Sequence, residues 1–173
     1  RLSMVFQDVY LFDDSLIANI RVGRPDASDE EVFRAADLSG VTSIANRLGW
    51  HTPVGEGGRL LSGGERQRVS VARALLKQAP IVLFDEATSA LDAENEANIL
   101  AAMDELREQS TFIVIAHKLD TIKSADQIVV LDEHGQVSQL GTHSELSDVP
   151  GIYRHFWQQR KAARGWKISS GRD

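Results

Sequence analysis

The sequence has no cysteine, no long hydrophobic run and no excess of basic residues. The absence of cysteine excludes disulfides, cysteine metal sites and thiol catalysis, and it fits a reducing compartment without proving one. The longest apolar runs, at 81–84, 112–116 and 128–131, are far shorter than the roughly 20 residues of a membrane-spanning helix. The net charge is -6, so bulk charge gives no reason to expect nucleic-acid binding.

The composition is that of an ordinary globular domain. With 173 residues, 42% apolar and 25% charged, the chain is long enough to bury one hydrophobic core. It begins at Arg1, with neither an initiator methionine nor a signal-peptide pattern. We therefore expect it to be a piece of a longer polypeptide.

Apolar strands alternate with helical patterns along the chain. Strands are predicted at 2–6, 81–84, 111–115 and 128–131, followed by a turn and an edge strand at 137–140. The strand at 81–84 is apolar throughout, which is typical of a parallel strand covered on both faces. Helix starts are predicted from Ser28 with Glu31 and from Thr142 with Glu145, two capping-box patterns. This order predicts an α/β fold with a parallel sheet, interrupted by an all-helical insert at about 15–76.

A serine and two glycines open the helical run that follows Leu61. Ser62, Gly63 and Gly64 place bare backbone N–H groups and a hydroxyl at one helix end. Such an end carries unsatisfied donors and the positive end of the helix dipole, so it suits a phosphate. A flexible turn at Gly63-Gly64 is the alternative, but it leaves the sequence of the following helix unexplained.

Two carboxylates end the apolar strand at 81–84. Asp85 and Glu86 lie where open α/β sheets place their ligands. Asp85 could hold Mg²⁺ and Glu86 could act as a general base. Taken alone, the pair is equally consistent with helix capping after a strand.

Together these stretches resemble the motifs of ATP-binding cassette (ABC) ATPases. Residues 61–75 resemble the signature motif and its helix, with Glu65 where glutamine is usual, and 85–92 resemble Walker B running into the D-loop. The resemblance implies a P-loop NTPase-like sheet flanked by helices, which binds ATP and Mg²⁺. Residue by residue, it implies that Gln7, Glu86 and His117 are catalytic, that Asp85 and Gln7 hold the metal, and that Ser62, Gly63, Gly64, Glu65 and Asp92 bind nucleotide. The other four histidines are predicted to be surface residues.

Two further segments resemble the exporter-type members of that family. Residues 7–20 are similar to the Q-loop region, and 52–58 to the X-loop with its Val-Gly-Glu core. In that family both segments face the coupling helices of the transmembrane domains, on the cytoplasmic face of an inner or plasma membrane. Two solvated loops are the alternative interpretation.

The lysine-bearing phosphate loop of such ATPases, Gly-x-x-x-x-Gly-Lys-Ser/Thr, does not occur in this sequence. We therefore expect residues 1–157 to be the C-terminal part of a nucleotide-binding domain, without its N-terminal β-subdomain and Walker A strand, and 158–173 to be a basic tail. On this interpretation the chain alone neither hydrolyses ATP nor folds robustly, because nothing anchors the phosphate and a sheet edge stays open. The signature motif would face ATP held by a second nucleotide-binding domain, identical or different.

The function implied is ATP hydrolysis that powers transport across a membrane, with no nucleic-acid partner. Two alternatives remain open: a soluble ABC ATPase with a role outside transport, and a regulatory, degenerate half of an asymmetric dimer. The stretch 156–166 resembles actinobacterial half-transporters that handle iron siderophores.

Overall fold

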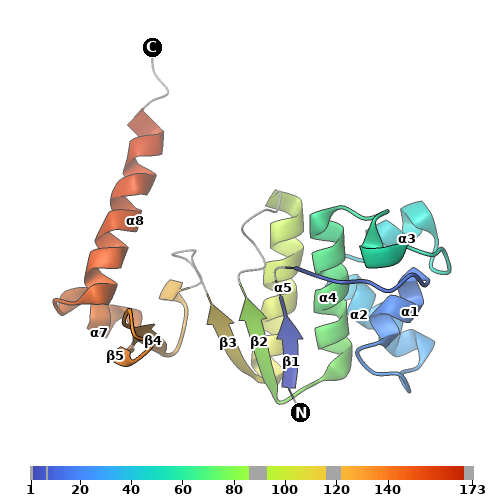
Figure 1. The fold of residues 1–173 in the computed structure, drawn as a ribbon, viewed down its shortest axis with the longest axis horizontal. Helices are drawn as coiled ribbons and strands as arrows, with labels where there is room; N and C mark the ends of the chain where they lie inside the picture. The colour runs from blue at the N-terminus through green and yellow to red at the C-terminus, as the bar shows by residue number, and fades with distance from the viewer. Residues whose placement is uncertain (1, 7, 86–92, 116–121, 170–173) are drawn as a thin grey trace. The chain divides into compact units, whose positions relative to one another are not determined.

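The computed structural model describes residues 2–6, 8–85, 93–115 and 122–169 (Figure 1). The chain divides into two compact units, Arg1–Ile115 and Ala116–Asp173. Each unit has its own sheet, so each is described separately. Within the described residues, no helix combines the length and the apolar character needed to cross a membrane.

A three-stranded parallel sheet forms the centre of the first unit. Its strands are β1 (Leu2–Val5), β2 (Ile81–Asp85) and β3 (Thr111–Ile115), in the spatial order β1-β2-β3. In the register of the sheet, Val5 lies opposite Phe84 and Asp85 lies opposite Ile115. All three strands run in the same direction, so their carboxyl ends share one edge of the sheet (Figure 1). The prediction of an α/β fold with a parallel sheet is confirmed.

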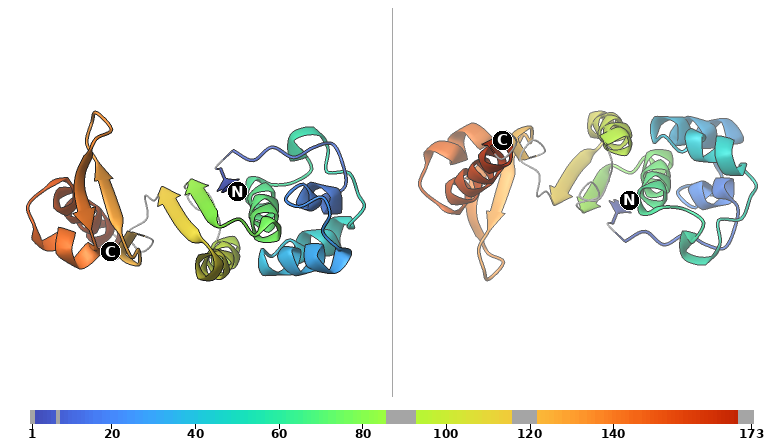
Figure 2. Two further views of the ribbon diagram at one scale, coloured as in Figure 1. Left: turned by 90° about the horizontal axis from the view of Figure 1, so that it is seen from below. Right: turned by 90° about the horizontal axis from the view of Figure 1, so that it is seen from above.

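Helices occupy most of the chain between β1 and β2. They are α1 (Leu16–Arg21), α2 (Asp29–Leu38), α3 (Thr42–Leu48), the 3-10 turn η1 (Glu56–Gly58) and α4 (Gly63–Lys77). Helix α5 (Ala93–Gln109) precedes β3. Helix α4 contacts β1, α5, α1 and α2, so it joins the sheet to the helical region (Figures 1 and 2).

One face of the sheet is buried and the other is exposed. Val5, Val82 and Phe84 share a core cluster with the inner sides of α4 and α5. On the opposite face, Ile81 is 41% exposed and Ile115 is 58% exposed. The prediction that strand 81–84 is covered on both faces is therefore wrong for the described residues, because α4 and α5 both pack on the same side of the sheet. An uninterrupted apolar strand sequence does not distinguish one covering layer from two.

Local sequence sets the starts of three helices. The two predicted capping boxes are both present: Ser28 with Glu31 at α2, and Thr142 with Glu145 at α7 (His143–Asp148). A third box, which is not among the predicted ones, joins Ser62 to Glu65 at α4. In each box the hydroxyl accepts from the N–H of the glutamate, whose carboxylate accepts from the N–H of the capping residue, so two otherwise unpaired donors are satisfied.

Gly23 allows α1 and α4 to approach closely. A Cβ at this position would lie 2.3 Å from the backbone oxygen of Arg73, far inside van der Waals contact. Gly23→Ala is therefore expected to force the two segments apart and to cost about 1–3 kcal/mol, as overpacking of a core does. Hydrogen exchange of α1 in the complete protein would measure this. Gly63→Ala is the control, because a Cβ there meets nothing nearer than Arg66 Nη2 at 4.0 Å; equal exchange in both variants would contradict the prediction.

The second unit is a β-hairpin followed by two helices. Strands β4 (Ile128–Leu131) and β5 (Val137–Gly141) pair antiparallel, and α7 and α8 (Ile152–Ser169) follow. The prediction that 128–131 is a third buried strand of the parallel sheet is wrong. The hairpin turn at 132–136 returns the chain onto β4, and Val129 and Leu131 stay more than half exposed. The predicted turn and edge strand are confirmed.

His143 is not a surface residue, contrary to the sequence prediction. It is half-buried, its Nδ1 lies 2.8 Å from the hydroxyl of Tyr153, and its ring packs on Trp157 with centroids 4.3 Å apart. Tyr153 itself is buried, and burial raises the pKa of its hydroxyl. His143 therefore belongs to the small core of the second unit, between α7 and α8.

Candidate nucleotide-contacting site

The start of α4 is an exposed helix end with a preorganised cap. Ser62 Oγ accepts from the N–H of Glu65 at 3.2 Å, and Glu65 Oε2 accepts from the N–H of Ser62 at 2.7 Å. The N–H of Arg66 begins the helical ladder by donating to the carbonyl of Ser62. Ser62 and Gly63 are exposed, whereas Leu61 just before them is buried. The loop is thus anchored on one side and open to solvent on the other.

Two amides at this helix end remain available. The cap and the first helical bond use the N–H groups of Ser62, Glu65 and Arg66, so those of Gly63 and Gly64 have no partner among the described residues. The Ser62 hydroxyl accepts a hydrogen bond in the cap, and its own proton is free to be donated outward. Gly63 has open space where a side chain would stand. The arrangement can bind an anion, since amide donors and the helix dipole point the same way.

A buried asparagine ties the loop at 8–15 to α1 and α4. Asn19 is fully buried, and its Oδ1 accepts from the N–H of Phe12 at 2.9 Å and from Arg73 Nη2 at 2.8 Å. Its Nδ2 donates to the carbonyl groups of Phe12, Asp14 and Ser15. All the polar capacity of this side chain is used, so it fixes the path of the loop.

Arg73, from the middle of α4, completes this connection. Its Nε donates to the carbonyl of Asn19 at 2.7 Å, and its Nη1 donates to the carbonyl of Tyr10 at 3.0 Å. Burial lowers the pKa of Arg73, but a guanidinium stays protonated. Its charge is satisfied by neutral oxygens and by the Phe12 ring, whose centroid lies 6.0 Å away. The helix that begins at Ser62 is therefore bonded directly to the loop.

The segment at 50–54 joins the same assembly through its backbone. The N–H of Val54 donates to the carbonyl of Asp14 at 3.0 Å, and the N–H of Ile17 donates to the carbonyl of Trp50 at 3.1 Å. The two segments that resemble the Q-loop region and the X-loop are thus hydrogen-bonded to each other. Tyr10 and Phe12 lie on the outside of this assembly with more than half of their surface exposed, ring edge against ring face.

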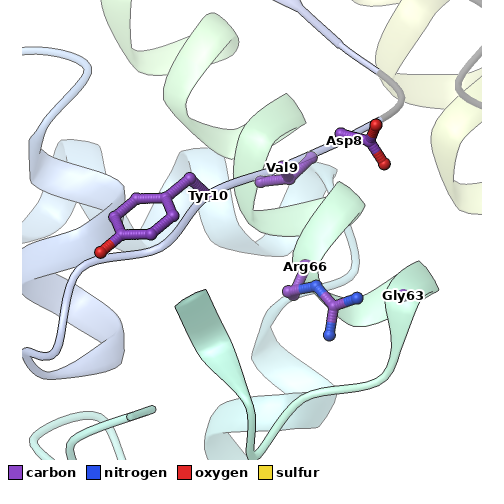
Figure 3. Close-up of a pocket in the computed structure, with 5 residues that line it drawn as sticks. All are labelled: Asp8, Val9, Tyr10, Gly63 and Arg66. Atoms are coloured by element: carbon purple, nitrogen blue, oxygen red, sulfur yellow. The ribbon is translucent and has the colours of Figure 1, made fainter. Parts of the chain in front are cut away.

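A shallow hollow of about 250 Å³ lies between the loop and α4 (Figure 3). Asp8, Val9 and Tyr10 line one side, and Gly63 and Arg66 line the other. It is smaller than the cavities of roughly 300–1,000 Å³ that hold whole cofactors. It could accept a single side chain or phosphate group, which fits a surface that contributes only part of a binding site.

Asp85 ends β2 at the carboxyl edge of the parallel sheet. It is half-buried and lies opposite Ile115 in the register of β3. One carboxylate together with phosphate oxygens is the usual protein contribution to a Mg²⁺ site, so this residue fits the metal that the sequence implies. Gln7, Glu86, Asp92 and His117 lie outside the described residues, so only Asp85 of the predicted catalytic and metal residues has a described position.

The structure assembles the four predicted signature residues, Ser62 to Glu65, at one helix end. It also shows three residues that sequence reasoning missed. Two of them are Asn19 and Arg73, which bind each other, and the third is Arg47, whose Nη2 donates to Oε1 of Glu65. The Ser-x-x-Glu spacing could have revealed the cap of α4. No local pattern could have revealed Asn19 with Arg73, because 54 residues separate the partners.

Comparison with known proteins agrees with this geometry. The sequence profile of the RecF/RecN/SMC N terminal domain family matches residues 9–139. The ATP-dependent lipid A-core flippase of Neisseria meningitidis serogroup A is 48% identical over 155 residues, which are 88% of this chain and 25% of the flippase. The mycobactin import ATP-binding/permease protein IrtB of Mycolicibacterium thermoresistibile is 47% identical over 171 residues, 98% of this chain and 29% of IrtB.

A solved structure of a bacterial Atm1-family ABC exporter with ATP bound superposes with a TM-score of 0.84 and 45% sequence identity, over 92% of this chain and 28% of the exporter chain. The chain belongs to the RecF/RecN/SMC N terminal domain family. The similarity to ABC exporters in both sequence and structure confirms the resemblance to an exporter-type nucleotide-binding domain. The chain spans about a quarter of the length of the curated relatives it matches.

Proposed function

We propose that this chain forms part of an ATP-binding and ATP-hydrolysing domain of an exporter-type ABC transporter, which powers movement of a substrate across a membrane. The observation that carries this proposal is the exposed, capped start of α4, with unpartnered amides at Gly63 and Gly64. A similar structure that holds ATP supports it. Ser62, Gly63 and Gly64 would contact the phosphates of ATP, with Glu65 forming the cap beside them, and Asp85 would contribute to binding Mg²⁺.

We place the phosphate that Ser62 contacts on a nucleotide held by a second nucleotide-binding domain, so the working unit is a dimer. Asp92 would lie across the same interface, and Gln7, Glu86 and His117 would act on the attacking water and the γ-phosphate. The domain would comprise residues 1–157, with a helical insert at about 15–76, and 158–173 would form a basic tail.

The membrane side of the proposal rests on the loop assembly around Asn19. Its exposed aromatics, Tyr10 and Phe12, offer a surface for a transmembrane domain, and Arg73 links that surface to α4. The domain would then work at the cytoplasmic face of a membrane. The substrate is a separate question, because a flippase and a mycobactin importer are about equally identical to this chain. A siderophore is supported by the mycobactin relative, which also matches 98% of the chain.

A soluble role is the second candidate, since the matching family profile is named after RecF, RecN and SMC proteins rather than transporters. The two candidates differ in one observable. A transporter hydrolyses ATP faster when its transmembrane domains hold substrate, whereas a soluble ATPase has no such dependence.

Gly63→Asp tests the nucleotide contact. An aspartate directly after the cap is compatible with a helix start, because α2 begins Ser28-Asp29 within the same type of capping box. The added charge would stand where the phosphate is proposed to lie. We expect at least a tenfold loss of Mg²⁺-dependent ATPase activity in the complete, membrane-reconstituted protein, with the thermal stability little changed. Ser144→Asp, in the first turn of α7, is the charge-matched control. Full activity of Gly63→Asp would overturn the proposed contact.

A further inference from the structure

Glu65 has two partners besides its place in the signature-like stretch. One carboxylate oxygen, Oε2, accepts from the N–H of Ser62 at 2.7 Å. The other, Oε1, accepts from Nη2 of Arg47 at 2.5 Å. Arg47 lies in the last turn of α3, 18 residues earlier in the chain. A continuous chain of hydrogen bonds therefore runs from α3 through Glu65 to Ser62.

The carboxylate of Glu65 is charged at neutral pH. Partial burial would raise its pKa, but the N–H of Ser62 and the guanidinium of Arg47 outweigh burial and lower it below its usual range. The side chain retains 16% exposure, so its charge is poorly screened by water. A full negative charge thus stands beside a helix end that, on the proposed function, receives the phosphates of ATP. The negative charge of Glu65 would repel the negatively charged phosphates and so oppose their binding.

Arg47 is not needed to build the cap itself. The box of Thr142 and Glu145 at α7 has the same hydrogen bonds, and there the glutamate has no cationic partner among the described residues. Helix capping therefore does not explain why an arginine reaches Glu65. In the third box, Arg24 contacts Glu31, at a helix end for which we propose no ligand.

We propose that Arg47 is a positioning residue for the nucleotide contact, which offsets the charge of Glu65 and keeps its carboxylate turned toward Ser62 and away from the phosphates. This inference rests on the proposed function. It accounts for glutamate at a position where the resemblance leads one to expect glutamine, because a neutral amide would need no such partner. Arg47 acts through Glu65 and is not a catalytic residue.

The test is a double-mutant cycle in the complete, membrane-reconstituted protein, with Arg47→Ala, Glu65→Gln and the combined variant. In the protein that retains Glu65, Arg47→Ala is expected to raise the KM for ATP about three- to tenfold, with a smaller change in kcat. In the Glu65→Gln background, the same substitution should leave the KM within about twofold. Arg47→Lys should keep the KM close to that of the unmutated protein, because lysine retains the positive charge. The effect should shrink in high salt, as that of a partly exposed charge does.

Arg34→Ala, at an exposed position of α2, is the matched control for removing one arginine from the helical region. An equal KM ratio in both backgrounds would overturn the inference, and so would a loss that Arg47→Lys does not restore. A loss of thermal stability that parallels the loss of activity in both backgrounds would also overturn it, in favour of a structural role. The absence of ATPase activity in the unmutated protein would instead contradict the proposed function, so the two failures are distinct.

Discussion

Asn19→Ala is expected to release the loop at 8–15 and to cost about 3–4 kcal/mol of local stability. The side chain is fully buried and serves two donors and three acceptors, with distances of 2.8–3.2 Å. Alanine would leave the N–H of Phe12 and one donor of Arg73 without their acceptor. The three carbonyl groups would each keep one backbone donor, so the cost comes mainly from the two unpaired donors and the cavity. Each buried polar group left unpaired costs about 1–3 kcal/mol, although water entering the cavity would recover part of that.

Hydrogen exchange in the complete protein measures this directly. Protection of 8–20 should fall by about 10²–10³, the equivalent of about 3–4 kcal/mol, whereas that of β2 and α5 should change little, because their contacts do not involve Asn19. Asn46→Ala, at an exposed position of α3, is the control. Arg73→Lys should give an intermediate loss of protection, because an ammonium keeps the charge but cannot make all three hydrogen bonds that the guanidinium makes to Asn19 and Tyr10. Unchanged protection at 8–20 in Asn19→Ala would contradict the account of this loop.

The features that sequence predicts well here are local ones. The caps at Ser28 and Thr142 depend on residues three apart, and the hairpin turn at 132–136 depends on adjacent ones, so the determinants of each lie in one short window. The parallel sheet followed from the alternation of apolar strands with helical segments. Recognition of the signature-like stretch likewise needed only contiguous residues.

The features that sequence missed depend on distant partners. Whether a strand is covered on one face or two depends on where helices pack, which the apolar pattern of 81–84 does not encode. The same limit applies to 128–131, which the sequence predicts as a buried strand and which instead pairs with β5 in an exposed hairpin. No prediction was made for Arg47 or Arg73, because Glu65 lies 18 residues from Arg47 and Asn19 lies 54 residues from Arg73. In the candidate site, therefore, the described residues proposed to touch the phosphate form one contiguous stretch, whereas the residues that hold this stretch in place come from other parts of the chain.

Glu86→Gln is expected to lower the kcat of Mg²⁺-dependent ATP hydrolysis in the complete protein by about 10²–10⁴, the range typical of losing a general base. Glu86 directly follows Asp85, which ends β2 at the carboxyl edge of the parallel sheet, where ligands of such sheets bind. Glutamine preserves the volume of the side chain and can still hydrogen-bond water, but it cannot accept a proton. The KM for ATP should therefore change much less than kcat.

Asp85→Asn separates the two adjacent carboxylates by their roles. Loss of a metal-binding oxygen should raise the Mg²⁺ concentration needed for half-maximal activity, whereas Glu86→Gln should leave that concentration nearly unchanged. Glu133→Gln, in the exposed turn between β4 and β5, controls for removal of a carboxylate. If Glu86→Gln kept most of the activity, or if it raised the Mg²⁺ requirement as Asp85→Asn is expected to do, Glu86 would not be the base. On the proposed function the two carboxylates would take different roles, with Asp85 holding the metal and Glu86 activating the attacking water, so the two substitutions should change different kinetic quantities.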